Sequence, residues 1–290
     1  MNVPKHITPT NNKSTRSAGR TTKQQLEILK LIYGFRFVST KHVQALLGKQ
    51  HLQQAQQRLT TLLAKGLIGR NFSSKDRLSG KFASHYLLPP GMKMLKQYGT
   101  SVDKQVLHNI YKDKTASERF IRHQMGLGDV YMELKRLYDD ELEFLTKSHV
   151  TGAFDYDYED DPENGHWYDF LPQPLPDVCG SLFVDSDDTR EYFLEYVEDT
   201  VPFFVYRNRI KFYVEYIEEG SWQENMFDLP TILLVCESPT LERRTKRFLK
   251  RYLQDVQEEG LVFKTTNKDK LGQAKIGDNV WEKFLAGGEN

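Results

Sequence analysis

Glutamine side chains recur along residues 50–65, a segment whose pattern predicts a helix. Its apolar residues fall on one stripe. The amide of glutamine donates and accepts hydrogen bonds, so it suits the edge of a DNA base, adenine especially. A merely solvated face normally includes Glu and Asp, and this segment has neither. The pattern favours DNA contact over the alternative, a small helical bundle with a solvated face. The candidate base-contacting residues are Gln50, Gln53, Gln54, Gln57, Arg58 and Thr61.

Basic residues follow this helix in a stretch that predicts a β-hairpin. Two short strand-like segments, ending near residue 72 and beginning near residue 82, surround a loop of Ser, Lys, Asp, Arg and Gly. The cationic side chains of this stretch are suited to pair with phosphate groups. They are Arg70, Lys75, Arg77 and Lys81.

Two further helices are predicted ahead of the glutamine-rich one. Apolar residues recur at three- and four-residue steps from Thr22, a helix cap, to Gly34. Ser39 is a good N-cap for a second helix that ends at Gly48. Residues 1–21 contain almost no large apolar side chain and predict a flexible basic arm.

Three helices followed by a basic hairpin resemble the winged helix-turn-helix fold over residues 22–98, and a short helix at 92–98 closes the segment. The resemblance implies that the third helix enters the major groove and that the hairpin lies along the DNA backbone. We therefore expect residues 22–100 to form a DNA-binding domain. Such domains also mediate protein contacts, so the motif is only moderately specific.

Residues 115–285 predict one α/β domain with a mixed sheet. Helical patterns cover residues 115–138, 206–217 and 240–258, and strand patterns cover 181–184, 192–197, 231–236 and, as the final strand, 261–264. Residues 151–170 are acidic and aromatic without a sustained period, and predict a surface insertion. The expected fold class is α+β or α/β, with an N-terminal winged helix ahead of the mixed sheet.

Two carboxylates stand beside the predicted hairpin of this domain. Asp177 follows Pro176 before the first strand, and Glu195 lies in the second. This pattern resembles the PD-(D/E)xK nuclease-like fold. The resemblance implies that Asp177 and Glu195 hold a divalent metal, usually Mg²⁺, and that a lysine two residues after the glutamate helps to position the attacking water. Val197 occupies that position, so Lys211, on the following helix, is the candidate replacement.

The remaining chemically versatile residues have structural interpretations. Cys179 and Cys236 form no CxxC or Cys/His pattern, which predicts buried thiols rather than a disulfide framework or a zinc site. His123 is expected to be a satisfied structural histidine. Asp185 belongs to an acidic turn, where aspartate bonds its own backbone.

A basic run lies on the predicted helix at 240–258. Six of nine positions from Arg243 to Arg251 are Lys or Arg. Arg243 and Arg247 are candidate phosphate contacts beside Asp177 and Glu195, and a solvated helix face is an equal alternative.

The charge of the chain is strongly polarised although its formal net charge is zero. Residues 1–124 carry 22 Lys and Arg against 5 Asp and Glu, and the remainder carries 18 against 35. Such asymmetry points to nucleic-acid contact by the basic part. The chain has no apolar run long enough for a membrane span and no secretory signal, so a cytoplasmic protein without a membrane partner is expected.

The order of these features resembles the replication-relaxation family of plasmid and mobile-element proteins, over residues 22–281. The features are the winged helix, the segment SERFIRHQMGLGDVYMEL, the Pro-Asp, the glutamate strand and ILLVCES. The resemblance implies a bacterial double-stranded DNA-binding protein of replication, DNA relaxation or conjugative transfer. Three hypotheses stay open: a DNA binder with a degenerate nuclease-like domain, a Mg²⁺-dependent nicking or cleaving endonuclease, and a module that recruits replication or transfer proteins.

Overall fold

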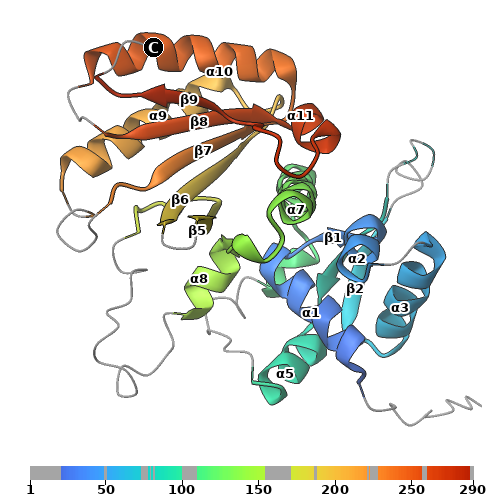
Figure 1. The fold of residues 1–290 in the computed structure, drawn as a ribbon. Coiled ribbons are helices and arrows are strands. Elements are labelled where there is room, and N and C mark those ends of the chain that lie inside the picture. Colours follow the sequence, from blue (N-terminus) through green and yellow to red (C-terminus); the bar gives the residue numbers. More distant parts are fainter. Residues whose placement is uncertain are drawn as a thin grey trace, which may run out of the picture.

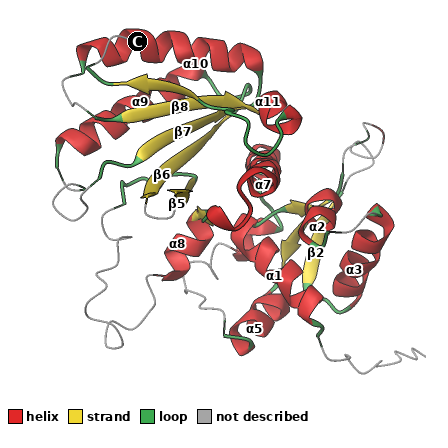
Figure 2. Ribbon diagram, in the orientation of Figure 1, coloured by secondary structure: helices red, strands yellow, loops and turns green. Residues whose placement is uncertain are grey.

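The chain combines a helical N-terminal region with a six-stranded mixed sheet (Figure 1). This confirms the expected mixture of helices and strands, which Figure 2 colours by type. The computed structural model describes residues 21–48, 51–72, 78, 80, 82–99, 110–153, 171–185, 188–220, 222, 228–256 and 260–287. Residues 1–20 of the predicted arm, Gln50, Lys75, Arg77, Lys81 and most of the predicted insertion, 154–170, lie outside them.

The helices of the N-terminal region begin where the sequence supplies caps. Helix α1 (Lys23–Phe35) starts behind a capping box made by Thr22 and Gln25. Helix α2 (Thr40–Leu46) starts behind Ser39, whose hydroxyl accepts from the backbone N–H of His42. Helices α3 (Leu52–Ala64) and α5 (Pro89–Gln97) follow. The predicted caps are confirmed, and the predicted ends are correct to within about two residues except at α5, which begins at Pro89 rather than at Met92.

A small antiparallel sheet joins these helices. Its strands β1 (Val38–Ser39), β2 (Ile68–Asn71) and β3 (Ser84–Leu87) run in the order β1-β3-β2. Strand β2 pairs with β3 from Ile68↔Leu87 to Asn71↔Ser84, so the predicted hairpin is confirmed.

The larger sheet places its strands side by side in chain order. They are β4 (Leu145–Thr146), β5 (Val178–Asp185), β6 (Asp188–Val197), β7 (Thr231–Cys236), β8 (Val262–Asn267) and β9 (Glu282–Leu285). Strands β6, β7 and β8 are parallel to one another, and the other neighbours pair antiparallel. The sequence prediction of 261–264 as the final strand was wrong, because β9 follows it. Only Phe284 of the four β9 residues is buried, so the segment lacks the alternation of apolar and polar residues that predicts a strand.

Helices cover both faces of this sheet. They are α7 (Glu118–Tyr138), α8 (Lys147–Ala153), α9 (Phe203–Glu218), α10 (Pro239–Tyr252) and α11 (Lys268–Gln273), with short 3₁₀ turns at Asp139–Glu141 and Leu253–Asp255. The predicted insertion at 151–170 therefore begins with helical residues, because α8 runs to Ala153. In the described part of the chain, no helix combines the length and apolar character that a membrane crossing requires.

Helix α7 lies between the N-terminal region and the sheet (Figure 1). It packs against α1, α2 and β1 on one side and against β6 and α11 on the other. Leu194 and Tyr196 of β6 share a buried apolar cluster with α7 and α1, whereas Phe193 and Val197, which point to the other face, pack with α9 and α10. The N-terminal region and one face of the sheet therefore share a single core.

Two glycines allow α7 to approach its neighbours closely. A Cβ at Gly126 would lie 2.3 Å from the Tyr196 ring, and one at Gly128 would lie 2.7 Å from the His42 ring. Both distances are shorter than van der Waals contact, so a larger side chain would push α7 away from the sheet or from α2. These glycines fix the position of α7, which carries His123 into the site described next.

Candidate functional site

The structure brings Asp177 and Glu195 together at one end of the β5–β6 hairpin. Val178 pairs with Leu194 in the antiparallel register, so Asp177, just before β5, and Glu195 of β6 follow at opposing positions. Each residue is only 7% exposed. Two neighbouring carboxylates at this depth need cationic or hydrogen-bonding partners, because an unpaired buried charge is strongly destabilising.

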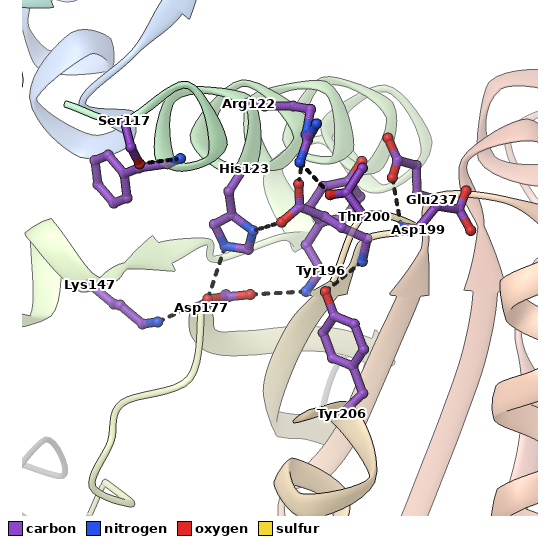
Figure 3. A network of polar contacts seen from close by, with 12 residues as sticks. Ser117, Arg122, His123, Lys147, Asp177, Tyr196, Asp199, Thr200, Tyr206 and Glu237 are labelled. Atoms are coloured by element: carbon purple, nitrogen blue, oxygen red, sulfur yellow. Dashed lines mark hydrogen bonds and ion pairs between the residues drawn. The ribbon is translucent and has the colours of Figure 1, made fainter. Parts of the chain in front are cut away.

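Asp177 receives three donors (Figure 3). Its Oδ1 lies 2.9 Å from Nζ of Lys147 and 3.2 Å from Nε2 of His123. Its Oδ2 accepts from the backbone N–H of Tyr196 at 3.1 Å. Burial by itself raises the pKa of this carboxyl, but the charge of Lys147 and the hydrogen bond and charge of His123 outweigh burial and hold the pKa well below its usual range. Asp177 is therefore ionised at neutral pH.

Glu195 is held from α9. Its Oε1 accepts from Nε of Arg209 at 2.7 Å and from the hydroxyl of Tyr213. A second nitrogen of Arg209 donates to the carbonyl of Pro174 at 2.8 Å, which fixes the guanidinium beside the carboxylate. Burial and the nearby charge of Asp177 raise the pKa of Glu195, against the opposing charges of Arg209 and Lys147. The ionised form of Glu195 therefore depends on Arg209.

His123 connects this pair to a third buried carboxylate. Its Nε2 faces Asp177 (Figure 3), and its Nδ1 lies 2.8 Å from Oε2 of Glu198. Burial lowers the pKa of the imidazole, but the hydrogen bonds and charges of Asp177 and Glu198 together raise it to about 10. Arg122, one residue earlier on α7, donates to Oε1 of Glu198 at 3.3 Å. The imidazole is therefore a cation at neutral pH, engaged on both ring nitrogens.

Lys211 lies apart from these carboxylates. It is on the exposed face of α9, and its ammonium is 5.8 Å from the ring centroid of Tyr252. The described residues that contact the Asp177 carboxylate include Lys147 but not Lys211. Val197, where the motif has its lysine, is buried in the apolar cluster beneath α9. The cation nearest to Asp177 thus comes from the start of α8.

Sequence reasoning missed Lys147 and Arg209 and gave His123 no specific partner. Lys147 lies 30 residues before Asp177 and carries no local signal. Arg209 does carry one, because it lies between Tyr206 and Tyr213 on a largely apolar helix, four residues before Tyr213. A cation at such a position predicts a buried acidic partner.

The donor set does not fit a divalent cation. Both carboxylate oxygens of Asp177 accept hydrogen bonds, and the carboxylate of Glu195 accepts hydrogen bonds from two donors. Among the described residues, no three His, Cys, Asp or Glu side chains are placed to hold a metal ion together. Lys147, His123 and Arg209 supply the positive charge that these carboxylates require, so the cluster is a self-neutralised ion network.

The second candidate site is the exposed face of α3. Gln53, Gln54 and Gln57 are exposed and, with their neighbours, line a shallow surface depression. Arg58 is half-buried, and the hydroxyl of Thr61 donates to the carbonyl of Gln57. The opposite face of α3 buries Ala55, Leu59 and Leu62, which confirms the predicted apolar stripe.

The structure also describes three of the basic residues that are candidate phosphate contacts. Arg70, on β2, is exposed, with its guanidinium 5.9 Å from the ring centroid of Phe72. Arg243 and Arg247 are exposed on α10, which packs against β7 and β8.

Comparison with known proteins gives one family. The replication-relaxation family model matches residues 29–230, more than half of the chain. No curated protein and no solved structure matches the chain. The matched segment runs from within α1 through α3, α7, the β5–β6 hairpin and α9 to the residue before β7, so it includes both candidate sites. The chain therefore belongs to the replication-relaxation family.

Proposed function

We propose that this protein binds double-stranded DNA of a plasmid or mobile element during its replication, relaxation or transfer, and that α3 reads the DNA site. In this proposal α2 and α3 form a helix-turn-helix, and the β2–β3 hairpin is the wing that lies against the DNA backbone. The α/β domain is a nuclease-like scaffold without catalysis.

The observation that carries the proposal is the exposed, acid-free face of α3. Its apolar side packs into the core, so the glutamines project outward from a rigid helix. Glutamine amides at helical spacing match the donor and acceptor pattern of adenine in the major groove. The surrounding charge is favourable for approach to DNA, since residues 1–100 carry 17 Lys and Arg against two acids.

Sequence selection from a random duplex library by the full chain tests this reading. We expect enrichment of one DNA site by the wild type, and Gln54→Ala/Gln57→Ala should bind that site at least about 30-fold more weakly, because each of the two base contacts contributes about 1–3 kcal/mol of discrimination. Gln97→Ala, at an exposed glutamine of α5, is the matched control and should bind normally. Equal affinity of the double variant and the wild type, or no enriched site, would contradict base reading by α3.

The ion network supports the non-catalytic role of the α/β domain. Asp177 and Glu195 lie on the hairpin that the PD-(D/E)xK resemblance implies, but their oxygens are held by the cations and hydroxyl of the chain itself. Opening this network to a divalent ion would displace Lys147, His123 and Arg209 from these carboxylates, which opposes metal binding.

Supercoiled plasmid incubated with Mg²⁺ or Mn²⁺ checks this assignment. We expect the wild type and Asp177→Asn to produce the same background of nicked circles, at protein concentrations up to a large excess over plasmid. Nicking by the wild type that Asp177→Asn and Glu195→Gln abolish would instead make the domain a metal-dependent endonuclease.

A further inference from the structure

A stripe of cations runs along the exposed side of α10. At 100° per residue, Arg243, Arg247, Lys250 and Arg251 fall within about one third of the helix circumference, and Arg244 lies at the edge of that arc. All five are exposed. The stripe from Arg243 to Arg251 is about 12 Å long at 1.5 Å per residue. We call these five residues the α10 stripe.

No described acid neutralises the α10 stripe. The acids that contact α10 are buried or bonded elsewhere: Glu242 pairs with Lys246 and Lys270, and Glu282 pairs with Lys246. Within the parts of the chain that the structure describes, no carboxylate forms an ion pair with a member of the stripe. This concentration of charge occurs in a half of the chain that is otherwise acidic, with 18 Lys and Arg against 35 Asp and Glu in residues 125–290. An excess of exposed like charges repels itself, so it favours a polyanionic partner.

Aromatic rings flank the stripe on the side of α9. The guanidinium of Arg244 lies 4.5 Å from the ring centroid of Phe203, and Phe248 and Tyr252 stack with centroids 5.4 Å apart. Lys211, on the exposed face of α9, extends the basic surface beyond Tyr252. Burial raises the pKa of the Tyr252 hydroxyl, and the charges of Glu215 and Glu218 raise it further, so the basic surface ends beside these two acids. The rings hold Arg244 and Lys211 at the rim of the stripe.

The α10 stripe and the α3 face belong to opposite sides of the molecule. Helix α10 packs on the sheet face that carries Phe193 and Ile232, whereas the N-terminal region shares its core with the other face, through α7. Figure 1 shows α10 at the far side of the sheet from α3. The α3 face and the α10 stripe are therefore separate surfaces.

We propose that the α10 stripe binds the phosphate backbone of a second segment of duplex DNA, so that one protein molecule bridges two segments. Duplex DNA carries about one charge per 1.7 Å of its axis, counting both strands, so about 12 Å of duplex carries roughly seven phosphates against the five cations of the stripe. The contact is to the backbone and is independent of sequence. It goes beyond base reading by α3, because it uses a different surface and needs no particular site.

The test measures the affinity of the full chain for a random-sequence 24-base-pair duplex against KCl concentration. Arg247→Gln/Lys250→Gln/Arg251→Gln should lower the slope of log affinity against log salt by about 2–3, since each neutralised phosphate contact contributes about 0.9. The matched control Lys112→Gln/Lys114→Gln/Lys275→Gln removes the same net charge from exposed positions outside α10 and should leave the slope nearly unchanged. Equal slopes for the two triple variants would overturn the proposal. Binding of poly-glutamate but not of the duplex would also do so, and would assign the stripe to an acidic protein.

Bridging is tested separately with an immobilised duplex that carries the site enriched by the wild type and a fluorescent random duplex in solution. The wild type should capture the fluorescent duplex. The α10 triple variant should bind the immobilised site as the wild type does but capture at least 10-fold less of the second duplex. On random duplex, Gln54→Ala/Gln57→Ala should keep the part of the salt slope that α10 contributes. Failure of base reading by α3 and failure of the α10 proposal therefore give different results. Capture that is unchanged in the α10 variant would exclude bridging through this surface.

Discussion

Replacing Arg209 with Met is expected to lower the free energy of unfolding by about 3–5 kcal/mol, the largest effect of a single substitution in the ion network. The side chain of Arg209 donates to Glu195, and both side chains are almost completely buried. Without the guanidinium, Glu195 either remains charged next to Asp177 with Tyr213 as its main donor, or takes up a proton. Both outcomes destabilise the fold, and urea denaturation measures the loss.

The pH dependence of this effect identifies Glu195 as its origin. In Arg209→Met the pKa of Glu195 in the folded protein rises further above its value in the unfolded chain. The folded state then binds more protons, so the free energy of unfolding falls as pH increases above about 4.5, and the loss is smaller at pH 5 than at pH 8. Glu195→Gln in the same chain should recover part of the loss. Lys211→Met, an exposed cation of the same helix, is the matched control, and a loss equal to that of Arg209→Met would contradict the assignment.

Stability should also fall with pH between about 6.5 and 10 because of His123. The imidazole has a pKa of about 10 in the folded protein against an ordinary value near 6.5, so over this range the folded state holds a proton that the unfolded chain has released. The stabilisation is complete below pH 6.5 and is lost as pH rises through 10, at up to about 1.4 kcal/mol per pH unit.

His123→Asn should remove most of this slope and lower stability most at pH 6.5. Denaturation in urea at pH 6.5, 7.5 and 8.5 measures it, a range that stays below the titration of most Lys and Tyr side chains. His51→Asn, at an exposed histidine before α3, should keep the wild-type slope. A slope that persists in His123→Asn would assign the pH dependence to another group.

The sequence predicted what local patterns encode. Thr22 and Ser39 cap helices whose apolar residues repeat at helical spacing, and β7 coincides with the predicted strand at 231–236, because a continuous apolar run there leaves little alternative. The hairpin that brings Asp177 and Glu195 together was also predictable, since a turn of Asp and Ser separates two strand-like runs.

The partners of those carboxylates were not predictable in the same way. Lys147 and His123 reach Asp177 from α8 and α7, which local periodicity does not relate to the hairpin. The candidate Lys211 was chosen because it lies on the helix after Glu195, but it lies on the exposed side of that helix, whereas Arg209, two residues earlier, points inward. The choice between two cations on one helix depends on which side packs against the sheet.

The position of α7 also limits how this protein can be rearranged in evolution. Phe35, at the end of α1, lies 5.1 Å from the ring of Tyr131 on α7 and 5.9 Å from that of Phe144, so the N-terminal region does not complete its own core. A recombination event with a breakpoint near residue 100 would separate these rings and leave an apolar surface on each product. The N-terminal region can pass to another protein only together with α7, or to a recipient whose own helix fits the same surface. The replication-relaxation match, over residues 29–230, spans this junction.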